Sequence, residues 1–216
     1  MTTESKRGRM VDHDLRDRGV RDERVLAAMA RVPREEFVPQ HSRDSAYDDN
    51  PLPIGDGQTI SQPYIVAFMA EAARITPGDT VLEIGTGSGY GAAVLASLAA
   101  HVHTIERHAT LAARAAETLE RVGFDTVQVH VGDGTVGLAD EAPFDAIVVT
   151  ASGPEIPSPL LEQLADGGRI VMPVERRRGH QQLMRATRSG DDFAEESLLG
   201  VVFVPLIGEH GYQHGR

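Results

Sequence analysis

The segment VLEIGTGSGYG, residues 81–91, decides how the rest of the sequence is interpreted. A short apolar run over 80–84 predicts a buried strand, and glycines follow it at alternate positions. Glycine lets the backbone turn tightly and approach a ligand closely. A helix is predicted next, over 90–100, and the free N–H groups at a helix start favour negative charge. The segment therefore predicts a strand, a ligand-binding turn and a helix.

Strands and helices alternate through most of the chain. The pattern predicts helices over 21–32, 61–75, 109–122 and 159–164, and further strands over 101–105, 126–131, 144–150 and 168–174. Such alternation is typical of a mostly parallel sheet with helices on both faces. Near the C-terminus, strands over 181–188 and 198–206 are separated only by the polar turn SGDD. We therefore expect an α/β, Rossmann-like, doubly wound fold with an N-terminal helical and loop segment and antiparallel C-terminal strands.

The length of 216 residues suffices for one well-buried α/β domain and is short for two. Residues 1–20 are charged and without periodicity, which predicts a flexible segment. A single domain is expected over 21–208, and a tail over 209–216. The stretch AYDDNPLPIGDGQT, residues 46–59, has no period and is rich in Pro, Gly, Asp and Asn. A long connection of this kind indicates a functional loop.

Composition narrows the classes of function. The absence of cysteine excludes disulfides, cysteine nucleophiles and thiolate metal sites. A net charge of −11 disfavours a nucleic-acid partner. The one compact basic cluster, Arg176, Arg177 and Arg178, is interpreted as a solvated loop. No apolar run is long enough for a membrane span, and the polar N-terminus is unlike a signal peptide, so we expect a cytoplasmic protein.

The glycine turn indicates the kind of ligand. The dinucleotide fingerprint G-x-G-x-x-G would require glycine at position 90, where the sequence has Tyr90. The pattern is instead E-x-G-x-G-x-G, with Glu83 preceding Gly85, Gly87 and Gly89. It resembles the nucleotide-binding turn of Rossmann-like methyltransferases, whose ligand carries a sulfonium and an amino-acid tail and no phosphate. Glu83 suits such a cation better than it suits a pyrophosphate.

Two further carboxylates follow later strands. Glu106 ends the second strand of the alternating unit, where Rossmann-like folds place an acid that accepts from both ribose hydroxyls. Asp133, in GDG after the third strand, is placed to accept from an adenine amino group. An exposed strand end and an ordinary turn are the respective alternatives. Because parallel strands end at one edge of a sheet, the three acids together predict one pocket.

Histidines give a weaker signal. His101 and His103 alternate on a predicted strand and share a face, and His108 follows nearby. No further ligands occur at metal-binding spacing, so no metal site is predicted. The terminal HGYQHGR, residues 210–216, is interpreted as a loose tail.

Longer motifs carry a family resemblance. They are RVLAAMARVPREEFVP (24–39), AYDDNPLPIGDGQTISQPYIVAFM (46–69), the ER of 106–107, VGDG (131–134), EAPFDAIVVTAS (141–152), IPSPLLEQLADGGRIVMPV (156–174) and VVFVPL (201–206). With the glycine turn, they resemble the protein-L-isoaspartate O-methyltransferase family over roughly residues 20–208. The part LPIGDGQTISQP is the most specific, because many methyltransferases share the glycine turn and not this segment. One departure is TASGPEIP (150–157), where the family often has small apolar residues.

The resemblance implies methylation of the free carboxylate of L-isoaspartyl and D-aspartyl residues in damaged proteins and peptides, which starts repair through a succinimide. It implies S-adenosyl-L-methionine as cofactor and S-adenosyl-L-homocysteine as product. It places the active-site residue on Ser61. It places cofactor contacts on Gln58, Thr59, Ile60, Glu83, Gly85, Thr86, Gly87, Ser88, Gly89, Glu106, Arg107, Asp133 and Gly134. A monomer without nucleic-acid or membrane partners is expected, with edge strands arranged differently from most methyltransferases.

Chemistry assigns Ser61 a holding role. A carboxylate is already ionised at neutral pH, so no general base is needed. Ser61 would donate to that carboxylate, helped by the free N–H groups of the helix that Pro63 starts. The alternative is a plain helix N-cap.

Three other functions remain open. The first is methylation of ordinary aspartate in a modified peptide, or of a small molecule. The second is an inactive binding module that keeps the nucleotide fold, which the intact acids disfavour. A hydride-transfer oxidoreductase is disfavoured by Tyr90 at the pyrophosphate glycine position.

Overall fold

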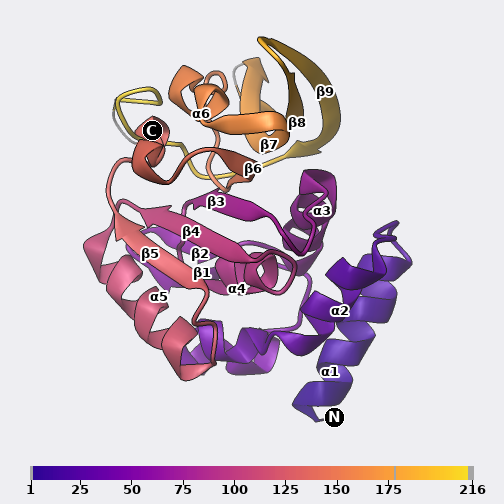
Figure 1. The fold of residues 1–216 in the computed structure, drawn as a ribbon. Helices are drawn as coiled ribbons and strands as arrows, with labels where there is room; N and C mark the ends of the chain where they lie inside the picture. Colours follow the sequence, from indigo (N-terminus) through magenta and orange to yellow (C-terminus); the bar gives the residue numbers. More distant parts are fainter. Residues whose placement is uncertain (1, 178, 214–216) are drawn as a thin grey trace.

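A computed structural model describes residues 2–177 and 179–213 and places a seven-stranded sheet at the centre of the molecule, in the order β5-β4-β3-β6-β7-β8-β9 (Figure 1). The strands are β3 (Thr80–Ile84), β4 (His101–Glu106), β5 (Val127–Val131), β6 (Phe144–Val149), β7 (Leu164–Arg177), β8 (His180–Ser189) and β9 (Asp192–Val201). Pairing is parallel from β5 through β7 and antiparallel from β7 to β9. The predicted mostly parallel sheet with an antiparallel C-terminal part is confirmed.

Helices cover both faces of this sheet. They are α1 (Thr3–Arg9), α2 (Glu23–Arg31), α3 (Pro63–Ala73), α4 (Tyr90–Ala96), α5 (Ala109–Arg121) and α6 (Ser158–Glu162), with shorter helical turns η1 (Met10–Arg16), η2 (Arg34–Phe37), η3 (Gln40–Ser45), η4 (Gly134–Val136) and η5 (Ala139–Glu141). Among the described residues, no helix combines the length and apolar composition that crossing a membrane requires.

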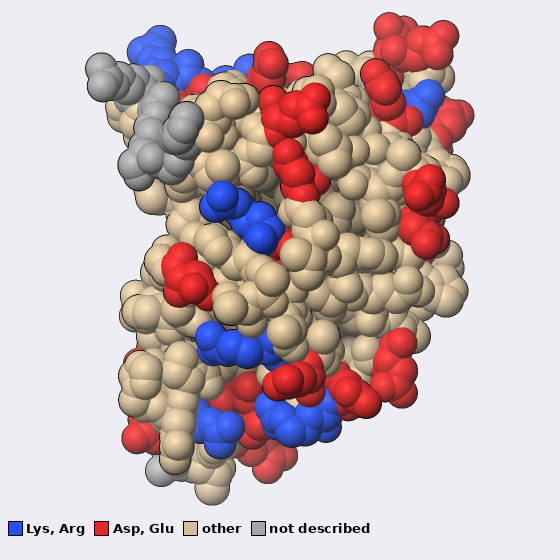
Figure 2. Space-filling model, turned by 90° about the vertical axis from the view of Figure 1, so that its left-hand side faces the viewer, with Lys and Arg blue, Asp and Glu red and all other residues tan. Residues whose placement is uncertain are grey.

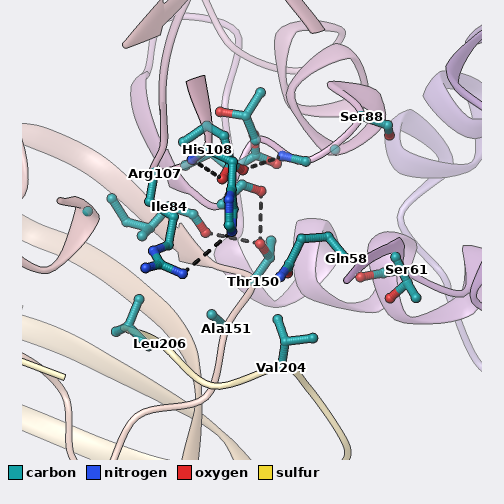
Figure 3. Close-up of a pocket in the computed structure, with 18 of the residues that line it drawn as sticks. Gln58, Ser61, Ile84, Ser88, Arg107, His108, Thr150, Ala151, Val204 and Leu206 are labelled. Carbon is teal, nitrogen blue, oxygen red and sulfur yellow. Dashed lines mark hydrogen bonds between the residues drawn. The ribbon is translucent and has the colours of Figure 1, made fainter. Parts of the chain in front are cut away.

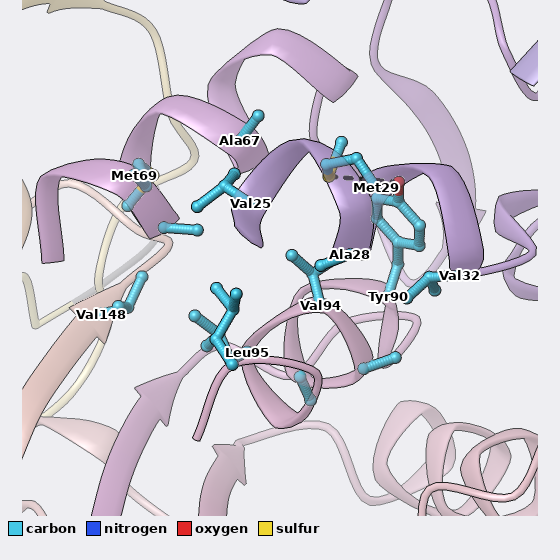
Figure 4. Packing of buried hydrophobic residues seen from close by; sticks show 14 of the residues in the cluster. Val25, Ala28, Met29, Val32, Ala67, Met69, Tyr90, Val94, Leu95 and Val148 are labelled. Atoms are coloured by element: carbon cyan, nitrogen blue, oxygen red, sulfur yellow. Dashed lines mark hydrogen bonds between the residues drawn. The ribbon is translucent and has the colours of Figure 1, made fainter. Parts of the chain in front are cut away.

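Neighbouring residues of β3 face two different cores, which makes the fold doubly wound. Val81 belongs to the core cluster formed with the buried faces of α2, α3 and α4, whereas Leu82 and Ile84 pack with Leu160 of α6 on the other side. Figure 4 shows part of the first cluster. Each fully buried side chain of this size contributes about 1.5–3 kcal/mol. Burial on both faces explains why β3 is apolar at its buried positions except at Glu83.

The N-terminal segment differs from the flexible one predicted for residues 1–20. It forms α1 and the π-helical η1, and Met10, Leu15 and Val20 are completely buried. Of the buried residues in η1, Met10 lies five residues before Leu15 and Val11 four residues before it. Polar and charged residues surround these few apolar residues, so the sequence pattern shows no clear apolar face. Residues 1 and 214–216 of the two predicted terminal segments lie outside the described residues.

Three further predictions need correction. The unperiodic stretch 46–59 contains most of a small hairpin, β1 (Leu52–Gly55) paired with β2 (Gln58–Ile60), which turns at Asp56 and Gly57 with positive φ. The last strand is β9 and not the predicted 198–206. The sequence did not indicate its true start, because β9 is largely exposed and has no apolar alternation. Arg176 and Arg177 end β7 instead of forming a loop, and Arg178 lies outside the described residues.

Candidate active site at the carboxyl edge of the sheet

A cavity of about 390 Å³ opens where β3, β4 and β6 end. Its walls are the glycine turn 85–88, the hairpin end 57–61, residues 150–151 after β6, and the C-terminal segment 204–207 (Figure 3). Its volume is in the range of small-molecule sites. The structure therefore brings three segments that are distant in sequence against the glycine turn.

Most of the residues predicted from the sequence line this cavity. They are Gln58, Thr59, Ile60, Ser61, Glu83, Gly85, Thr86, Gly87, Ser88, Glu106, Arg107 and Gly134. Gly89 and Asp133 are not on its wall. Gly89 lies behind the turn, where an added Cβ would be 3.3 Å from Leu119 of α5, so its role is close helix packing.

Glu106 ties the ends of β3 and β4 together. One carboxylate oxygen accepts from the Gly87 N–H (2.9 Å), and the other accepts from the His108 N–H (3.0 Å). The side chain is buried at the bottom of the cavity wall. Because a carboxylate has about four acceptor sites, it retains capacity for two ligand hydroxyls.

Glu83 is a buried acid without a cationic partner among the described residues. Thr104 Oγ1 donates to its Oε2 (2.6 Å), and Thr86 Oγ1 lies 2.7 Å from Thr104 Oγ1. Burial raises the pKa of Glu83 to about 8; the Thr104 hydrogen bond opposes this rise and Glu106 adds to it. A cation entering the cavity would favour the ionised form. The buried acid thus fits a ligand with a positively charged group.

Gly85 shows why the turn requires glycine. Its φ is 98°, and an added Cβ would collide with Thr150 Oγ1. That hydroxyl is fixed in place, because it donates toward the carbonyls of Ile84 (3.0 Å) and Gly85 (2.9 Å). The ends of β3 and β6 are therefore joined directly under the cavity.

Asp133 is engaged elsewhere. Its carboxylate caps η4 by accepting from the N–H (2.8 Å) and the hydroxyl (2.7 Å) of Thr135, and it accepts from the N–H of Glu209 (2.7 Å). Burial alone would raise the pKa of Asp133, but these hydrogen bonds hold it below its usual value. The side chain connects the segment beside Gly134 to the C-terminal residues, a contact that was not predicted from the sequence.

Ser61 connects β2 to α3 and is partly buried at the cavity wall (Figure 3). Its hydroxyl makes no hydrogen bond with any residue that the structure describes. The prediction that free N–H groups of α3 help to hold the substrate carboxylate is wrong. Tyr64 N–H donates to Asp49 Oδ1 (2.9 Å) and Val66 N–H to the Gln62 carbonyl (3.2 Å). The N-cap alternative is also wrong, since Gln62 occupies that position.

Several residues that line the cavity were not predicted as site residues from the sequence. They are His108, Val66, Thr150, Ala151, Val204, Pro205, Leu206 and Ile207. The C-terminal segment reaches the cavity through a bridge in which Ser152 N–H donates to the Val204 carbonyl and Leu206 N–H to the Ser152 carbonyl, both at 2.8 Å. The motif VVFVPL was noticed, but nothing in its spacing places it beside residue 152.

Of the two histidines predicted to share a strand face, His103 lies on the sheet away from this wall, next to His130 of β5. His103 Nδ1 is 3.3 Å from His130 Nε2, the rings stack at 5.5 Å, and burial lowers the pKa of His103. Among the described residues, no three His, Cys, Asp or Glu side chains are grouped so that they could hold a metal ion.

Known proteins resemble this chain over nearly its whole length. The family model described as Protein-L-isoaspartate(D-aspartate) O-methyltransferase matches residues 5–211. A protein named protein-L-isoaspartate O-methyltransferase from Roseiflexus castenholzii is 57% identical over 208 residues, covering 96% of this chain and 94% of that protein. One named protein-L-isoaspartate O-methyltransferase 1 from Rhodopseudomonas palustris is 56% identical over 209 residues, covering 96% and 85%.

Solved structures of proteins with the same name have a similar fold. A protein-L-isoaspartate O-methyltransferase superposes with a TM-score of 0.86 at 29% identity, covering 95% of this chain and 67% of that chain. A putative protein-L-isoaspartate O-methyltransferase from Plasmodium falciparum, in complex with S-adenosyl-L-homocysteine, gives 0.81 at 25% identity, covering 93% and 98%.

Proposed function

Because the chain belongs to the protein-L-isoaspartate(D-aspartate) O-methyltransferase family, we propose that it methylates the free carboxylate of L-isoaspartyl and D-aspartyl residues in damaged proteins and peptides. One observation carries the proposal: the glycine turn and its two buried acids meet the end of the LPIGDGQTISQP segment in one cavity. In the resulting ester, the next backbone nitrogen attacks the carbonyl carbon and methanol leaves. This closes a succinimide, which opens the repair route.

Different residues of the cavity wall would hold different parts of the cofactor. When bound, S-adenosyl-L-methionine supplies an electrophilic methyl group on a sulfonium. Glu106, with spare acceptor capacity, would hold the ribose hydroxyls, and buried Glu83 would face the ammonium of the amino-acid tail. The remaining residues proposed for the cofactor site are Gln58, Thr59, Ile60, Gly85, Thr86, Gly87, Ser88, Gly89, Arg107, Asp133 and Gly134. Of these, Gly89 and Asp133 lie behind the wall and would support it without lining it.

Ser61 is the proposed catalytic residue on the substrate side. The substrate carboxylate is already the nucleophile at neutral pH. Since the Ser61 hydroxyl has no partner among the described residues, it is free to donate to that carboxylate and hold it in line. Ser61 therefore positions the attacking oxygen through a hydrogen bond and does not itself form a covalent bond.

A Ser61→Ala variant tests this role. We expect kcat for an isoaspartyl peptide to fall about 10- to 100-fold, the worth of one hydrogen bond to a charged group. The Kd for S-adenosyl-L-homocysteine, measured by calorimetry, should stay within about twofold. Ser197→Ala, on β9 away from the cavity, is the matched control and should change neither quantity. An equal loss of cofactor affinity in Ser61→Ala would show that the residue has another function.

A pair of peptides that differ only in isoaspartate or aspartate separates the alternatives. Transfer of labelled methyl to the isoaspartyl peptide alone supports the repair function. Equal transfer to both supports the related methyltransferase of ordinary aspartate. Binding of S-adenosyl-L-homocysteine without transfer to either supports an inactive module.

We further propose a cytoplasmic monomer built on one domain over 21–208 whose core the N-terminal helices extend. The net charge of −11 supports the expectation of no nucleic-acid partner, and on the face in Figure 2 the basic side chains lie interleaved with acidic ones. Isoaspartyl proteins are its partners. Sedimentation of the purified chain tests the monomeric state.

A further inference from the structure

We propose that Asp49 is a positioning residue for methyl transfer, because it caps helix α3 and thereby fixes Ser61 against the cavity. This inference rests on the proposed function and extends it to a residue outside the cavity wall. Asp49 lies between η3 and the hairpin, twelve residues before Ser61 in sequence.

The contacts of Asp49 are made with the residues that follow Ser61. Its Oδ1 accepts from the Tyr64 N–H (2.9 Å), and its Oδ2 accepts from Gln62 Nε2. On the other side of Ser61, Ile60 is held by its pairing with Leu52 in the hairpin. Ser61 is therefore fixed from both directions, by the hairpin before it and by Asp49 after it.

The sequence around Ser61 leaves this cap to a distant residue. Pro63 is the first residue of α3 and has no N–H, and the side chain of Gln62, the N-cap residue, makes no capping hydrogen bond. Ordinarily a local serine would satisfy the first free N–H groups. Asp49 accepts from the Tyr64 N–H instead, and the Ser61 hydroxyl, one residue before the N-cap, remains available at the cavity wall.

Arg18 holds Asp49 in turn. Its guanidinium forms an ion pair with Asp49 Oδ2 and stacks over the Tyr64 ring, 3.8 Å from the centroid. The Asp49 side chain is only 13% exposed, so this pair is less screened than a surface pair. A carboxylate at the start of an eleven-residue helix is also favoured by the helix dipole. The N-terminal segment thus contributes to the arrangement of the substrate side.

The test compares Asp49→Ala with Asp22→Ala, which removes the cap of α2 far from the cavity wall. We expect Asp49→Ala to lower kcat for an isoaspartyl peptide about tenfold, with Kd for S-adenosyl-L-homocysteine within about twofold. Asp22→Ala should lower Tm in the same way, because it also removes a cap, and leave kcat within about twofold. If Asp49→Ala lowers kcat no more than Asp22→Ala, the inference is wrong.

A double-mutant cycle separates positioning from general stability. In the Ser61→Ala background, Asp49→Ala should cost little further turnover, because the hydroxyl that it positions is gone. A full tenfold loss in that background would overturn the inference. Should Asp49→Ala fail to fold, Asp49→Asn serves in both arms. It keeps an acceptor for the Tyr64 N–H but loses the ion pair with Arg18, so we expect a smaller loss of turnover that is again absent in the Ser61→Ala background. A wild-type chain inactive on the isoaspartyl peptide would instead refute the proposed function. A fully active Ser61→Ala would refute the role proposed for Ser61 and, with it, this inference.

Discussion

The two sides of the cavity are built by different kinds of contact. On the cofactor side, the hydrogen bonds join β3 and β4, which are neighbouring parallel strands, as in Glu106 to Gly87 and Thr104 to Glu83. On the substrate side, Ser61 depends on Asp49 and Arg18, and the opposite wall depends on the bridge from Ser152 to the C-terminal segment. The first side follows from one βαβ unit, whereas the second needs the whole chain to be folded.

This difference predicts separable defects. Damage to the glycine turn should abolish cofactor binding directly, whereas damage to the distant supports should reduce turnover and leave the cofactor bound. Residues that connect the two sides should show both defects, and they are the most informative test of the division.

Gly85→Ala should have the largest effect. Alanine at a φ of 98° is strained by about 1–2 kcal/mol, and its Cβ would also collide with Thr150 Oγ1. We expect the affinity for S-adenosyl-L-homocysteine, measured by calorimetry, to fall about 100-fold. Gly123→Ala is the control, since its φ is 81° and no atom lies within 4 Å of the added Cβ. It should lose stability and retain affinity; equal binding by both variants would contradict the prediction.

The same contrast explains how much the sequence could predict. Glu83, Gly85 and Glu106 are recognisable because strand, turn and strand-end acid lie at fixed spacings within one unit. The cavity-lining C-terminal segment is not recognisable, because no local period encodes a bridge between residues 152 and 204. The buried part of the N-terminal segment is not recognisable either, because its few apolar residues are surrounded by polar and charged ones. Asp133 shows what the sequence could not predict. Its place after the third strand of the alternating unit is visible in the sequence, but the hydrogen bond that it accepts from Glu209 depends on the C-terminal segment folding back against it.

Asp133→Ala tests the residue that connects the two sides. It removes the cap of η4 beside Gly134 and the hydrogen bond that holds the C-terminal segment. We expect about a tenfold loss in both S-adenosyl-L-homocysteine affinity and isoaspartyl-peptide KM, the worth of a charge-assisted hydrogen bond. The exposed Asp140→Ala should change neither. If only the peptide KM rises, Asp133 supports the substrate side alone and its predicted adenine contact is wrong.

The smallest expected effect on cofactor binding is a pH dependence, and it has a counterpart in the stability of the ligand-free protein. Glu83 has a pKa of about 8 in the folded protein and 4.5 as its ordinary value, so the folded chain binds the extra proton between these pH values. The free energy of unfolding of the ligand-free protein should therefore be largest at low pH. It should decline as pH rises toward 8, by at most about 1.4 kcal/mol per pH unit. Glu83→Gln should flatten this decline, as followed by urea unfolding.

Cofactor binding should have the opposite pH dependence, because a ligand ammonium favours the ionised Glu83. Affinity for S-adenosyl-L-homocysteine should rise about fivefold between pH 6.5 and 8, and Glu83→Gln should remove the rise. Glu120→Gln, exposed on α5, controls for the loss of one acidic side chain. The Asp49→Ala variant should keep the full wild-type rise, because its defect lies on the substrate side. A flat wild-type profile would mean that Glu83 does not face the charged tail, and a flat profile in Asp49→Ala alone would mean that the two sides are coupled more closely than their contacts indicate.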